Sequence, residues 1–338
     1  MPRGSTPPNA ITILHVAAEA GVSKSTVSLV LKNSPLIPEE TSQRVREAAR
    51  KIGYVYNRRA AEMRLKSSNT IGVVINDLMN PFFAEVLIGI ERKLVEAGYI
   101  VFMAHTNENL ELQEKVLLSM REQNAAGIVL CPAFGTPNSL PKMVKAWGIP
   151  LTVIVRTLGA GSYDFAGSDN ERGVYLATKH LIDAGHKRIG FLGGRAGVTL
   201  QQRIAGYRTA LTESAIAFDP ALVLSANPNR QGGHYTMCAL LDIRPRVSAA
   251  VAYNDIVAFG ALSALGERGL RAGKDFALMG FDNVLDAAHS NPPLSTVDIR
   301  PNELGEHAAA ILLARIAEPN RARQTYLAAP DLVLRQSV

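Results

Sequence analysis

The sequence is poor in cysteine, has no long hydrophobic run and lacks a general excess of charge. Its two cysteines, Cys131 and Cys238, stand in apolar surroundings without a CxxC partner. We therefore expect buried, reduced thiols and neither a disulfide framework nor a zinc site. No run approaches the roughly 18 uninterrupted apolar residues of a membrane span. The first ten residues, MPRGSTPPNA, have no apolar core typical of a signal peptide, so we expect a cytoplasmic protein with no membrane partner.

Signatures of catalysis are equally scarce. The seven histidines are scattered without metal-ligand spacing, and no serine stands in a GxSxG setting. A glycine-rich turn at residues 190–197 follows a predicted strand, but its spacing is not GxGxxG, and no acidic residue ends a following strand about 20 residues later. Close approach of the backbone to a ligand or a helix explains these glycines more simply. We expect no enzyme activity, no metal and no cofactor, and a nucleotide-dependent enzyme stays as a rival interpretation.

The net charge of the chain is confined to its N-terminal segment. Residues 1–66 hold 11 Lys and Arg against 5 Asp and Glu, whereas residues 67–338 hold 25 of each sign, so the first segment accounts for the whole net charge of +6. Such confinement is typical of a segment that binds nucleic-acid phosphates, because a general solubilising charge would be spread along the chain. With 47% hydrophobic residues, the 338-residue chain has enough apolar surface for two or three folded domains.

Residues 13–31, ILHVAAEAGVSKSTVSLVL, predict a helix, a tight turn and a second helix. Apolar positions recur at helical spacing on both sides of a break at Gly21, and Ser23 is placed to cap the second helix. Val27 and Val30 point toward the first helix, which leaves a small, polar and cationic face on the other side. A helix that reads base edges in a DNA major groove needs such a face. An ordinary amphipathic hairpin has the same pattern, so this stretch alone does not decide between the two.

Two further segments complete the N-terminal part. A third helix is predicted from Thr41 to Ile52, after Pro38 and before a break at Gly53, which gives an all-α helix-turn-helix head over residues 1–53. Residues 54–69 are polar and basic and contain too little apolar surface to fold alone. They fit a solvated linker, and they also fit a hinge that becomes helical only on DNA.

From residue 70 onward, short apolar β-branched runs alternate with amphipathic helical stretches. This alternation predicts an α/β core of parallel sheets covered on both faces, and the number of elements suits two lobes with a ligand cleft between them. The stretch 292–299 is predicted to cross back between the lobes. The predicted strands span residues 71–75, 100–104, 127–131, 151–155, 188–192, 249–253 and 276–280. The predicted helices span residues 83–97, 110–123, 173–184, 203–212, 256–268 and 303–317.

The order of these motifs resembles the lactose-repressor (LacI/GalR) family along nearly the whole chain. The matching motifs are VAAEAGVSKSTVSLVL, GYVYNRRA, IGVVI followed by NPFFAEV, HKRIGFLGG, QRIAGY, AVAYND, MGFDN and PPLSTV. The resemblance implies a homodimer whose heads bind a palindromic operator DNA, with the second helix in the major groove and paired hinge helices in the central minor groove. It places the DNA contacts at Thr12, Ser23, Lys24, Ser25, Thr26, Ser28 and Leu29 in the head and at Asn57, Arg58, Ala60 and Met63 in the hinge.

Three residues depart from the family's usual DNA-binding pattern. Leu29 can offer only apolar contact, such as to a thymine methyl, where a polar or arginine side chain would seek guanine. Met63 stands where the family usually has a leucine wedge, and its flexible side chain should hold a DNA kink less firmly. Tyr56 replaces a common proline. We therefore expect a different operator sequence and a less firmly held central kink.

The resemblance also implies a core similar to periplasmic sugar-binding proteins, with a small effector held between two doubly wound parallel-sheet lobes. By position it assigns the effector contacts to Asp77, Phe82, Phe83, Asp169, Asn170, Thr199, Arg203, Asn227, Asn254 and Asp282. Carboxylate, amide and guanidinium groups can bind vicinal sugar hydroxyls in pairs, and an aromatic ring can cover the sugar's apolar face. Structural alternatives stay open: Phe82 or Phe83 can belong to the core, and Asn254 can cap a helix. Asn227 lies in a loop, Ser225-Ala226-Asn227-Pro228, in which some relatives have an aromatic side chain, and the lack of that ring disfavours a stacked purine.

Together these observations predict a repressor of carbohydrate uptake or catabolism genes that a sugar or glycoside releases from its operator. One alternative is a nucleobase-like corepressor that tightens DNA binding, and another is a sugar-binding protein or nucleotide-dependent enzyme without DNA binding. The expected domains are the head at 1–53, the hinge at 54–69 and the core at 70–338. The first lobe should cover about 70–166 and 298–325, and the second about 167–297 and 326–338. We expect the protein in the cytoplasm, associated with the nucleoid.

Overall fold

A computed structural model describes residues 11–31, 34–55, 68–159, 161 and 163–338. The chain divides into two compact units, Met1–Ser67 and Ser68–Val338, which are described separately below. The predicted hinge contacts Asn57, Arg58, Ala60 and Met63 lie outside the described residues, as does Tyr56.

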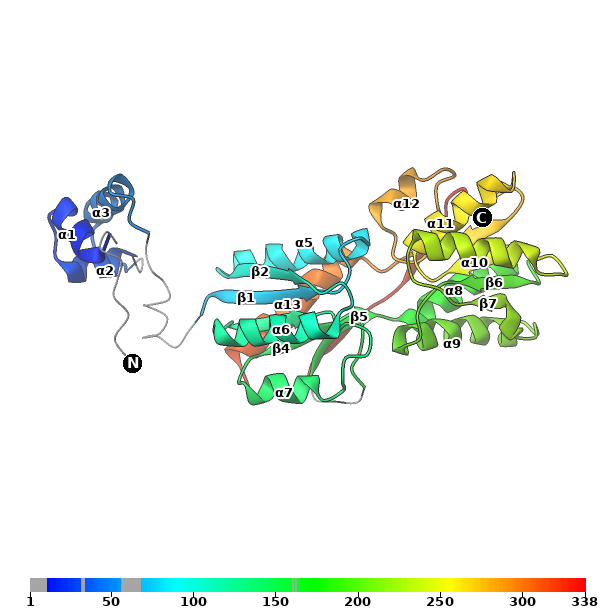
Figure 1. Cartoon of the computed structure of the whole chain (residues 1–338), viewed down its shortest axis with the longest axis horizontal. Coiled ribbons are helices and arrows are strands. Elements are labelled where there is room, and N and C mark those ends of the chain that lie inside the picture. The colour runs from blue at the N-terminus through cyan, green and yellow to red at the C-terminus, as the bar shows by residue number, and fades with distance from the viewer. Residues whose placement is uncertain (1–10, 32–33, 56–67, 160, 162) are drawn as a thin grey trace. The chain divides into compact units, whose positions relative to one another are not determined.

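The described residues of the first unit form three short helices (Figure 1), and their apolar side chains pack into a small core. The helices are α1 (Ile13–Ala20), α2 (Lys24–Leu31) and α3 (Glu39–Lys51). Gly21 ends α1 in the left-handed region, at a φ of 63°. Ser23 caps α2, because its Oγ accepts a hydrogen bond from the backbone N–H of Thr26 at 3.1 Å. Val16, Val27 and Val45 each contribute a fully or almost fully buried side chain to the core. The predicted helix-turn-helix head is confirmed.

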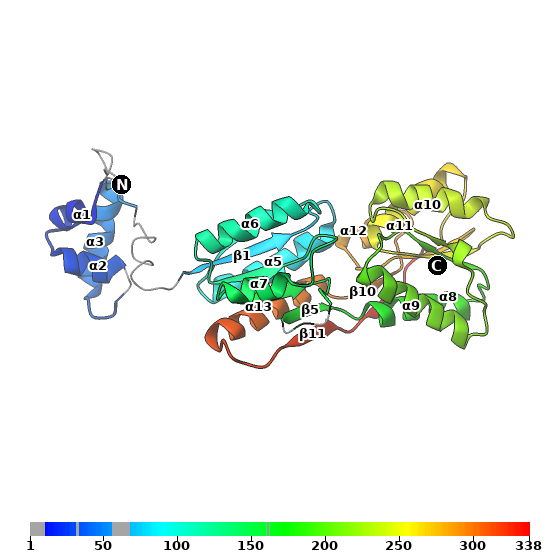
Figure 2. The same cartoon turned by 60° about the horizontal axis from the view of Figure 1, so that its bottom comes forward.

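The second unit begins with a lobe built on a six-stranded parallel sheet in the order β11-β5-β4-β3-β1-β2. Its strands are β1 (Thr70–Ile75), β2 (Ile100–His105), β3 (Gly127–Leu130), β4 (Leu151–Ile154), β5 (Asp164–Ser168) and β11 (Thr325–Ala328). Helices α5 (Pro81–Glu96) and α13 (Pro301–Ala317) cover one face, and α6 (Leu110–Glu122) and α7 (Leu140–Ala146) cover the other (Figure 2). Alternate side chains of β1 enter different clusters, since Val73 packs with the α5 side and Val74 with the α6 side.

The other lobe contains a four-stranded parallel sheet in the order β7-β6-β8-β9. The strands are β6 (Ile189–Leu192), β7 (Val223–Leu224), β8 (Ala249–Ala252) and β9 (Ala277–Met279). Helices α8 (Asn170–Asp183) and α9 (Val198–Glu213) pack together on one face, and α10 (Arg230–Asp242) and α11 (Asp255–Glu267) on the other (Figure 1). The short elements η1 (Pro220–Leu222) and α12 (Leu285–His289) complete this lobe. The predicted fold class, two lobes with parallel sheets, is confirmed.

The chain crosses between the lobes three times. One crossing follows β5, and the others run along β10 (Thr296–Asp298) and between β11 and β12 (Asp331–Val333), where β10 and β12 pair antiparallel. Because β11 pairs with β5, the first lobe includes residues up to Ala328 and not only to the predicted 325. After the last crossing the chain is built into the second lobe, since the fully buried Ser337 accepts from the Ser295 N–H and donates to the Leu278 carbonyl.

The glycine-rich turn after β6 has a packing explanation. Gly193 and Gly194 adopt φ angles of 83° and 92°, which favour glycine. A Cβ atom at Gly194 would lie 2.6 Å from the Tyr253 ring and 2.8 Å from the Leu200 side chain. The glycines thus allow close approach of the backbone to α9 and to the end of β8. Among the described residues, no helix has the length and apolar character needed to span a bilayer.

Candidate effector cleft and DNA-reading face

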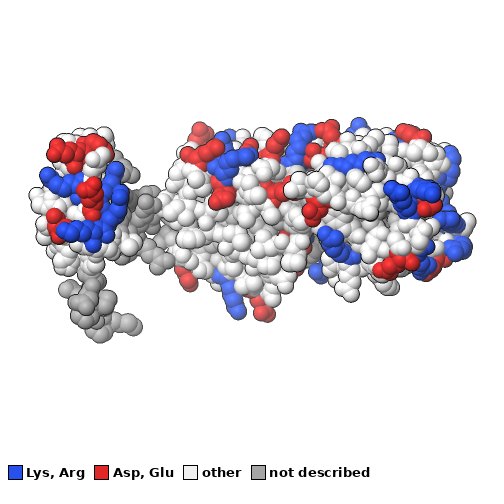
Figure 3. All heavy atoms as spheres, turned by 90° about the horizontal axis from the view of Figure 1, so that it is seen from above, with Lys and Arg blue, Asp and Glu red and all other residues white. Residues whose placement is uncertain are grey.

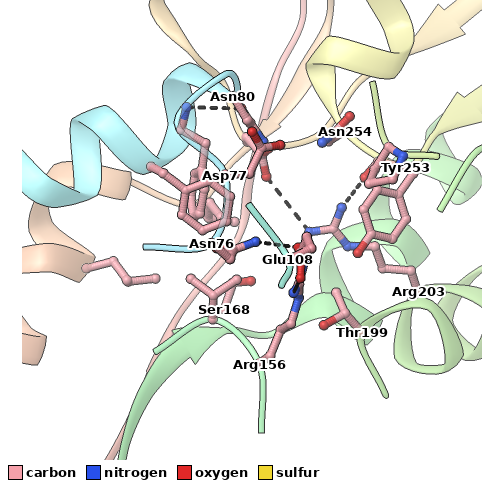
Figure 4. Close-up of a pocket in the computed structure, with 17 residues that line it drawn as sticks. Asn76, Asp77, Asn80, Glu108, Arg156, Ser168, Thr199, Arg203, Tyr253 and Asn254 are labelled. Carbon is pink, nitrogen blue, oxygen red and sulfur yellow. Dashed lines mark hydrogen bonds and ion pairs between the residues drawn. The ribbon is translucent and has the colours of Figure 1, made fainter. Parts of the chain in front are cut away.

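A cavity lies between the two lobes of the second unit, at the carboxyl ends of their strands (Figure 4). The empty volume of the cavity is about 580 Å³, which includes the solvent-filled space at its opening. The position is that expected for a ligand of open parallel sheets. The lining residues are Asn76, Asp77, Asn80, Phe82, Phe83, Glu108, Val155, Arg156, Ser168, Thr199, Arg203, Pro228, Tyr253, Asn254, Asp282, Ile299 and Leu304.

Seven of the ten predicted effector residues line this cavity, and three do not. Asp169 instead caps α8 through a 2.9 Å bond from the Arg172 N–H. Asn170 is buried, and its Oδ1 accepts a hydrogen bond from Arg203. Asn227 is exposed, and its neighbour Pro228 reaches the cavity in its place. The lining predictions are Asp77, Phe82, Phe83, Thr199, Arg203, Asn254 and Asp282.

Arg203 is a buried cation that organises the second-lobe wall. It lies on α9 with only 5% of its surface exposed. Its Nε donates to Asn170 at 2.9 Å, and its Nη1 donates to the Tyr253 carbonyl. The guanidinium carbon lies 3.8 Å from the centre of the Phe281 ring. These contacts hold the guanidinium in one orientation at the edge of the cavity.

Asp282 faces Arg203 across a short gap in the same wall. One carboxylate oxygen lies 3.8 Å from Nη2 of Arg203, and the side chain is almost completely buried. Burial raises the pKa of Asp282 to about 7, although the charge of Arg203 and a hydrogen bond from Asn80 act in the opposite direction. Asn80 belongs to the first lobe, so this bond joins the two walls. Asp282 also has a φ of 111°, a strained value for a residue with a side chain.

Phe82, Phe83 and Asn254 have the structural roles that the sequence left open, and they also line the cavity. Phe82 and Phe83 are both at least 95% buried, and their rings meet edge to face with centres 5.1 Å apart. Both also line the cavity. Asn254 caps α11 by accepting from the Val257 N–H at 2.9 Å while it lines the cavity. Each of these residues therefore has a structural role and a surface toward the ligand space.

The sequence did not reveal an ion pair at the first-lobe end of the cavity. Glu108 and Arg156 form two parallel hydrogen bonds of 2.9 and 2.8 Å. Burial tends to raise the pKa of Glu108, but the bonds and charge of Arg156 outweigh it and hold this pKa below its ordinary value. Val155 precedes Arg156 with a φ of 64°, which is unusual for a β-branched residue. Strain of this kind accumulates at ligand sites.

The first unit presents the predicted DNA-reading residues on one part of α2 and its cap. Lys24 and Ser25 are exposed, whereas Ser28 and Leu29 are half-buried. The Ser23 and Thr26 hydroxyls bond to each other at 2.9 Å. Thr12 precedes α1 and donates its N–H to His15 Nδ1 at 3.0 Å. On the second unit, Figure 3 shows acidic and basic side chains interspersed on the visible face, in agreement with its balanced composition.

Comparison with known proteins agrees with both halves of this description. Residues 12–57 match the family described as bacterial regulatory proteins, lacI family, and residues 178–338 match the periplasmic binding protein-like domain. The HTH-type transcriptional repressor PurR of Aliivibrio fischeri is 32% identical, with 97% of this chain and 98% of that protein covered. The ribose operon repressor of Haemophilus influenzae is also 32% identical, with the same coverage.

A solved structure of similar architecture is the transcriptional regulator CelR in complex with cellobiose. It is 28% identical to this chain, with a TM-score of 0.75, and the match covers 97% of this chain and 100% of that structure. Similarity over nearly the whole length, together with the helix-turn-helix head and the two-lobed core, shows the family to which the chain belongs. The chain belongs to the LacI family of bacterial regulatory proteins and is a DNA-binding transcriptional repressor.

Proposed function

We propose that a sugar or glycoside bound between the lobes releases this repressor from a palindromic operator that controls carbohydrate uptake or catabolism genes. The observation that carries the proposal is the composition of the cavity walls. Carboxylate, amide and guanidinium groups from both lobes surround a space that also touches two phenylalanines. A sugar offers both surfaces, since its hydroxyls form hydrogen bonds in pairs and its C–H groups pack on aromatic rings.

A nucleobase-like corepressor is the second candidate, and the similarity to repressors named PurR supports it. A flat base needs an open aromatic face for stacking. In this cavity Arg203 lies 4.5 Å from the centre of the Tyr253 ring, and Phe82 and Phe83 meet each other edge to face. The loop that includes Asn227 supplies Pro228 to the cavity and no ring. These contacts favour the sugar.

The repressor is proposed to act as a homodimer, with the head at 1–53, a hinge at 54–69 and the core at 70–338. Apolar side chains along β2, the outer strand of the first-lobe sheet, support such pairing, since Ile100, Phe102 and Met103 are each more than 40% exposed. Lys24, Ser25, Ser28 and Leu29 would read base edges. Thr12, Ser23 and Thr26 would position the head on the backbone. A cytoplasmic, nucleoid-associated regulator without enzyme activity fits this assignment.

Effector binding is proposed to act through the angle between the lobes. Asn80 and Asp282 already join the two walls, so a ligand that binds both walls changes the position at which the lobes meet. In a dimer, such a change in the angle between the lobes moves the first lobes of the two protomers relative to each other. The hinge segments then separate, and the two heads lose their common register on the operator.

The test combines operator binding with effector binding on the full-length protein. We expect salt-sensitive retention of operator DNA in a gel shift, and release by a member of a panel of pentoses, hexoses and glycosides. The same sugar at 100 times its dissociation constant should stabilise the core by about 2.7 kcal/mol in a thermal-shift assay. Release by no sugar, with tighter DNA binding on addition of purine bases, would establish the corepressor alternative. Absence of salt-sensitive DNA binding would contradict the repressor assignment itself.

A pair of variants on α9 separates effector binding from DNA binding. Arg203→Ala removes the buried guanidinium of the wall and should abolish the sugar response while operator binding persists. Arg208→Ala on the same helix is the control, because Arg208 is exposed and outside the cavity lining. If the Arg203 variant loses operator binding and keeps its response to sugar, the assignment of effector binding to the cavity and of DNA binding to the head is wrong.

A further inference from the structure

Asn76 places a buried acceptor without a partner at the cavity. It follows β1, lines the cavity and is only 1% exposed. Its Nδ2 donates to Glu108 at 2.7 Å, but its Oδ1 has no hydrogen-bond partner among the described residues. A buried amide oxygen of this kind is costly unless a donor reaches it. The ligand space is where such a donor can enter.

Glu108 fixes which end of the Asn76 amide faces the ligand. Its carboxylate accepts four hydrogen bonds: two from Arg156, one from Asn76 and one from the Phe134 N–H at 2.8 Å. A carboxylate can only accept, so a flipped amide would place two acceptors against each other. The Nδ2 atom therefore stays on Glu108, and Oδ1 remains a buried acceptor without a donor.

Both cations of the cavity already have partners in its walls. Arg156 is neutralised by Glu108 and also donates to the Pro132 carbonyl at 3.0 Å. Arg203 is engaged by Asn170, Tyr253 and Asp282. Among the described lining residues these are the two cations, and the lining also contains three carboxylates, Asp77, Glu108 and Asp282. An anionic group would have to compete with these contacts and would lie near three carboxyl groups, at a cost in desolvation and repulsion.

We propose that the first-lobe end of the cavity is a subsite for an uncharged hydroxyl group, with Asn76 as the specificity-determining residue that accepts its hydrogen bond. The effector class is then a free sugar or uncharged glycoside, and phosphate esters and sugar acids are rejected. This inference rests on the proposed function, because it assigns the chemistry of one end of the same cleft.

The first experiment is calorimetric titration of the full-length protein with pairs of ligands, each a free sugar and its phosphate ester. Each pentose and hexose of the panel is compared with its phosphate ester, starting with D-ribose and D-ribose 5-phosphate. We expect the free sugar that binds to exceed its ester by at least about tenfold in affinity, because the ester brings an unpaired buried anion. An ester that binds as tightly as its free sugar overturns the inference and leaves the sugar function standing. If no sugar of either kind binds, both proposals fail.

A matched pair of buried amides tests the role of Asn76. Asn76→Leu should weaken binding of the same free sugar by about tenfold, the value of one lost hydrogen bond. Gln113→Leu is the control, since Gln113 is equally buried, bonds to Ala133 and Thr136, and is not a cavity-lining residue. It should lower the melting temperature and leave the dissociation constant unchanged. Unaltered sugar affinity in folded Asn76→Leu protein would overturn the assignment.

A third variant tests the selectivity between a free sugar and its phosphate ester. Glu108→Gln removes the charge that neutralises Arg156 and lets the Asn76 amide turn. We expect the preference for the free sugar over its phosphate ester to shrink by about tenfold or more. A preference that stays at its original value would show that neither the paired charge nor the fixed amide sets the selectivity, and the inference would fall.

Discussion

Two buried carboxyl groups in the second lobe show how single residues tie stability to pH. Asp282 faces the cavity, and Asp255 at the start of α11 accepts from Thr296 and from the Val284 N–H. Burial raises the pKa of both groups, and for Asp255 the neighbouring Asp282 raises it further. In the folded protein each group holds its proton at pH values where the unfolded chain has lost it.

This difference predicts the sign of the pH effect for Asp282. Below pH 3.8 Asp282 is protonated in both the folded and the unfolded protein, and its full contribution to stability is present. Between pH 3.8 and about 7 this group is ionised only in the unfolded chain, so the free energy of unfolding falls as the pH rises. The upper limit of the loss is about 4 kcal/mol. Asp282→Asn should remove this contribution, which urea unfolding of the core at pH 4, 5.5 and 7 would measure.

The exposed Asp242, whose pKa is lowered by its hydrogen bonds with Arg268, provides the control. Asp242→Asn should leave the slope between pH 4 and 7 unchanged. If wild type and Asp282→Asn lose stability in parallel over this interval, Asp282 is ionised in the folded protein and its assignment as a neutral acid is wrong.

At the scale of elements, α2 is the part of the head on which DNA affinity should depend. Lys24 is exposed in its first turn, whereas Lys51 on α3 is paired with Glu19 at 2.6 Å. Lys24→Ala should weaken operator binding by about 1–3 kcal/mol and reduce the salt slope by about 1. Effector affinity should be nearly unchanged. Fluorescence anisotropy of labelled operator DNA at several salt concentrations measures the operator affinity and its salt slope.

Lys51→Ala removes the same charge from a position whose partner is within the head. We expect a much smaller change in operator affinity, because the salt bridge already neutralises this lysine. Equal losses for the two variants would mean that net charge alone governs binding and that α2 has no special role.

The elements that sequence reasoning found are those whose pattern is local. Each of the seven predicted strands and six predicted helices is present, because apolar runs and apolar periodicity can be recognised within a single segment of sequence. Helix α10 was missed since it contains Gly232 and Gly233, which are poor helix formers. A Cβ at Gly233 would lie 2.0 Å from the Val257 carbonyl oxygen, so the close packing of α10 on α11 requires glycine at this position. Strand β5, DFAGS, was missed because a glycine and an acid interrupt its short run.

Some residues of the cleft could be predicted from the sequence, whereas the contacts between their side chains could not. Residues such as Asp77 and Asp282 were assigned by position from the resemblance to the family, and both follow strands whose ends converge at the cavity. Glu108 and Arg156 are separated by 48 positions, and neither has a neighbour in sequence that reveals their pairing. Asn170 was predicted as a ligand contact, but it accepts a hydrogen bond from Arg203 and does not line the cavity. Such side-chain relations are fixed by packing and have no local signature.

For the core as a whole, contacts between the lobes should set the balance between closed and open forms. Glu85 on α5 accepts from the Leu285 N–H at 3.2 Å, which joins the first lobe to the start of α12. Glu85→Ala removes this contact outside the cavity lining. We expect a larger radius of gyration in small-angle scattering and a several-fold weaker affinity for a ligand that binds both walls. Glu91→Ala on the exposed side of the same helix should change neither value.

Coupling between the heads and the cleft must also be reciprocal. If a sugar weakens operator binding by a given factor, operator DNA must weaken sugar binding by the same factor. Titration of the sugar into the free repressor and into its operator complex measures the two affinities. Identical affinities in the two titrations would contradict the proposed release mechanism.

The late return of the chain into both lobes has a consequence for biosynthesis. Strand β11 completes the first-lobe sheet only at Thr325–Ala328, and Ser337 closes the contacts around β9 in the second lobe. On the ribosome, therefore, neither lobe can reach its final fold until almost all 338 residues have been synthesised. The three-helix head has all its core residues before position 55 and can fold while the rest is still being translated. A nascent chain would thus acquire its DNA-reading surface well before its effector cleft.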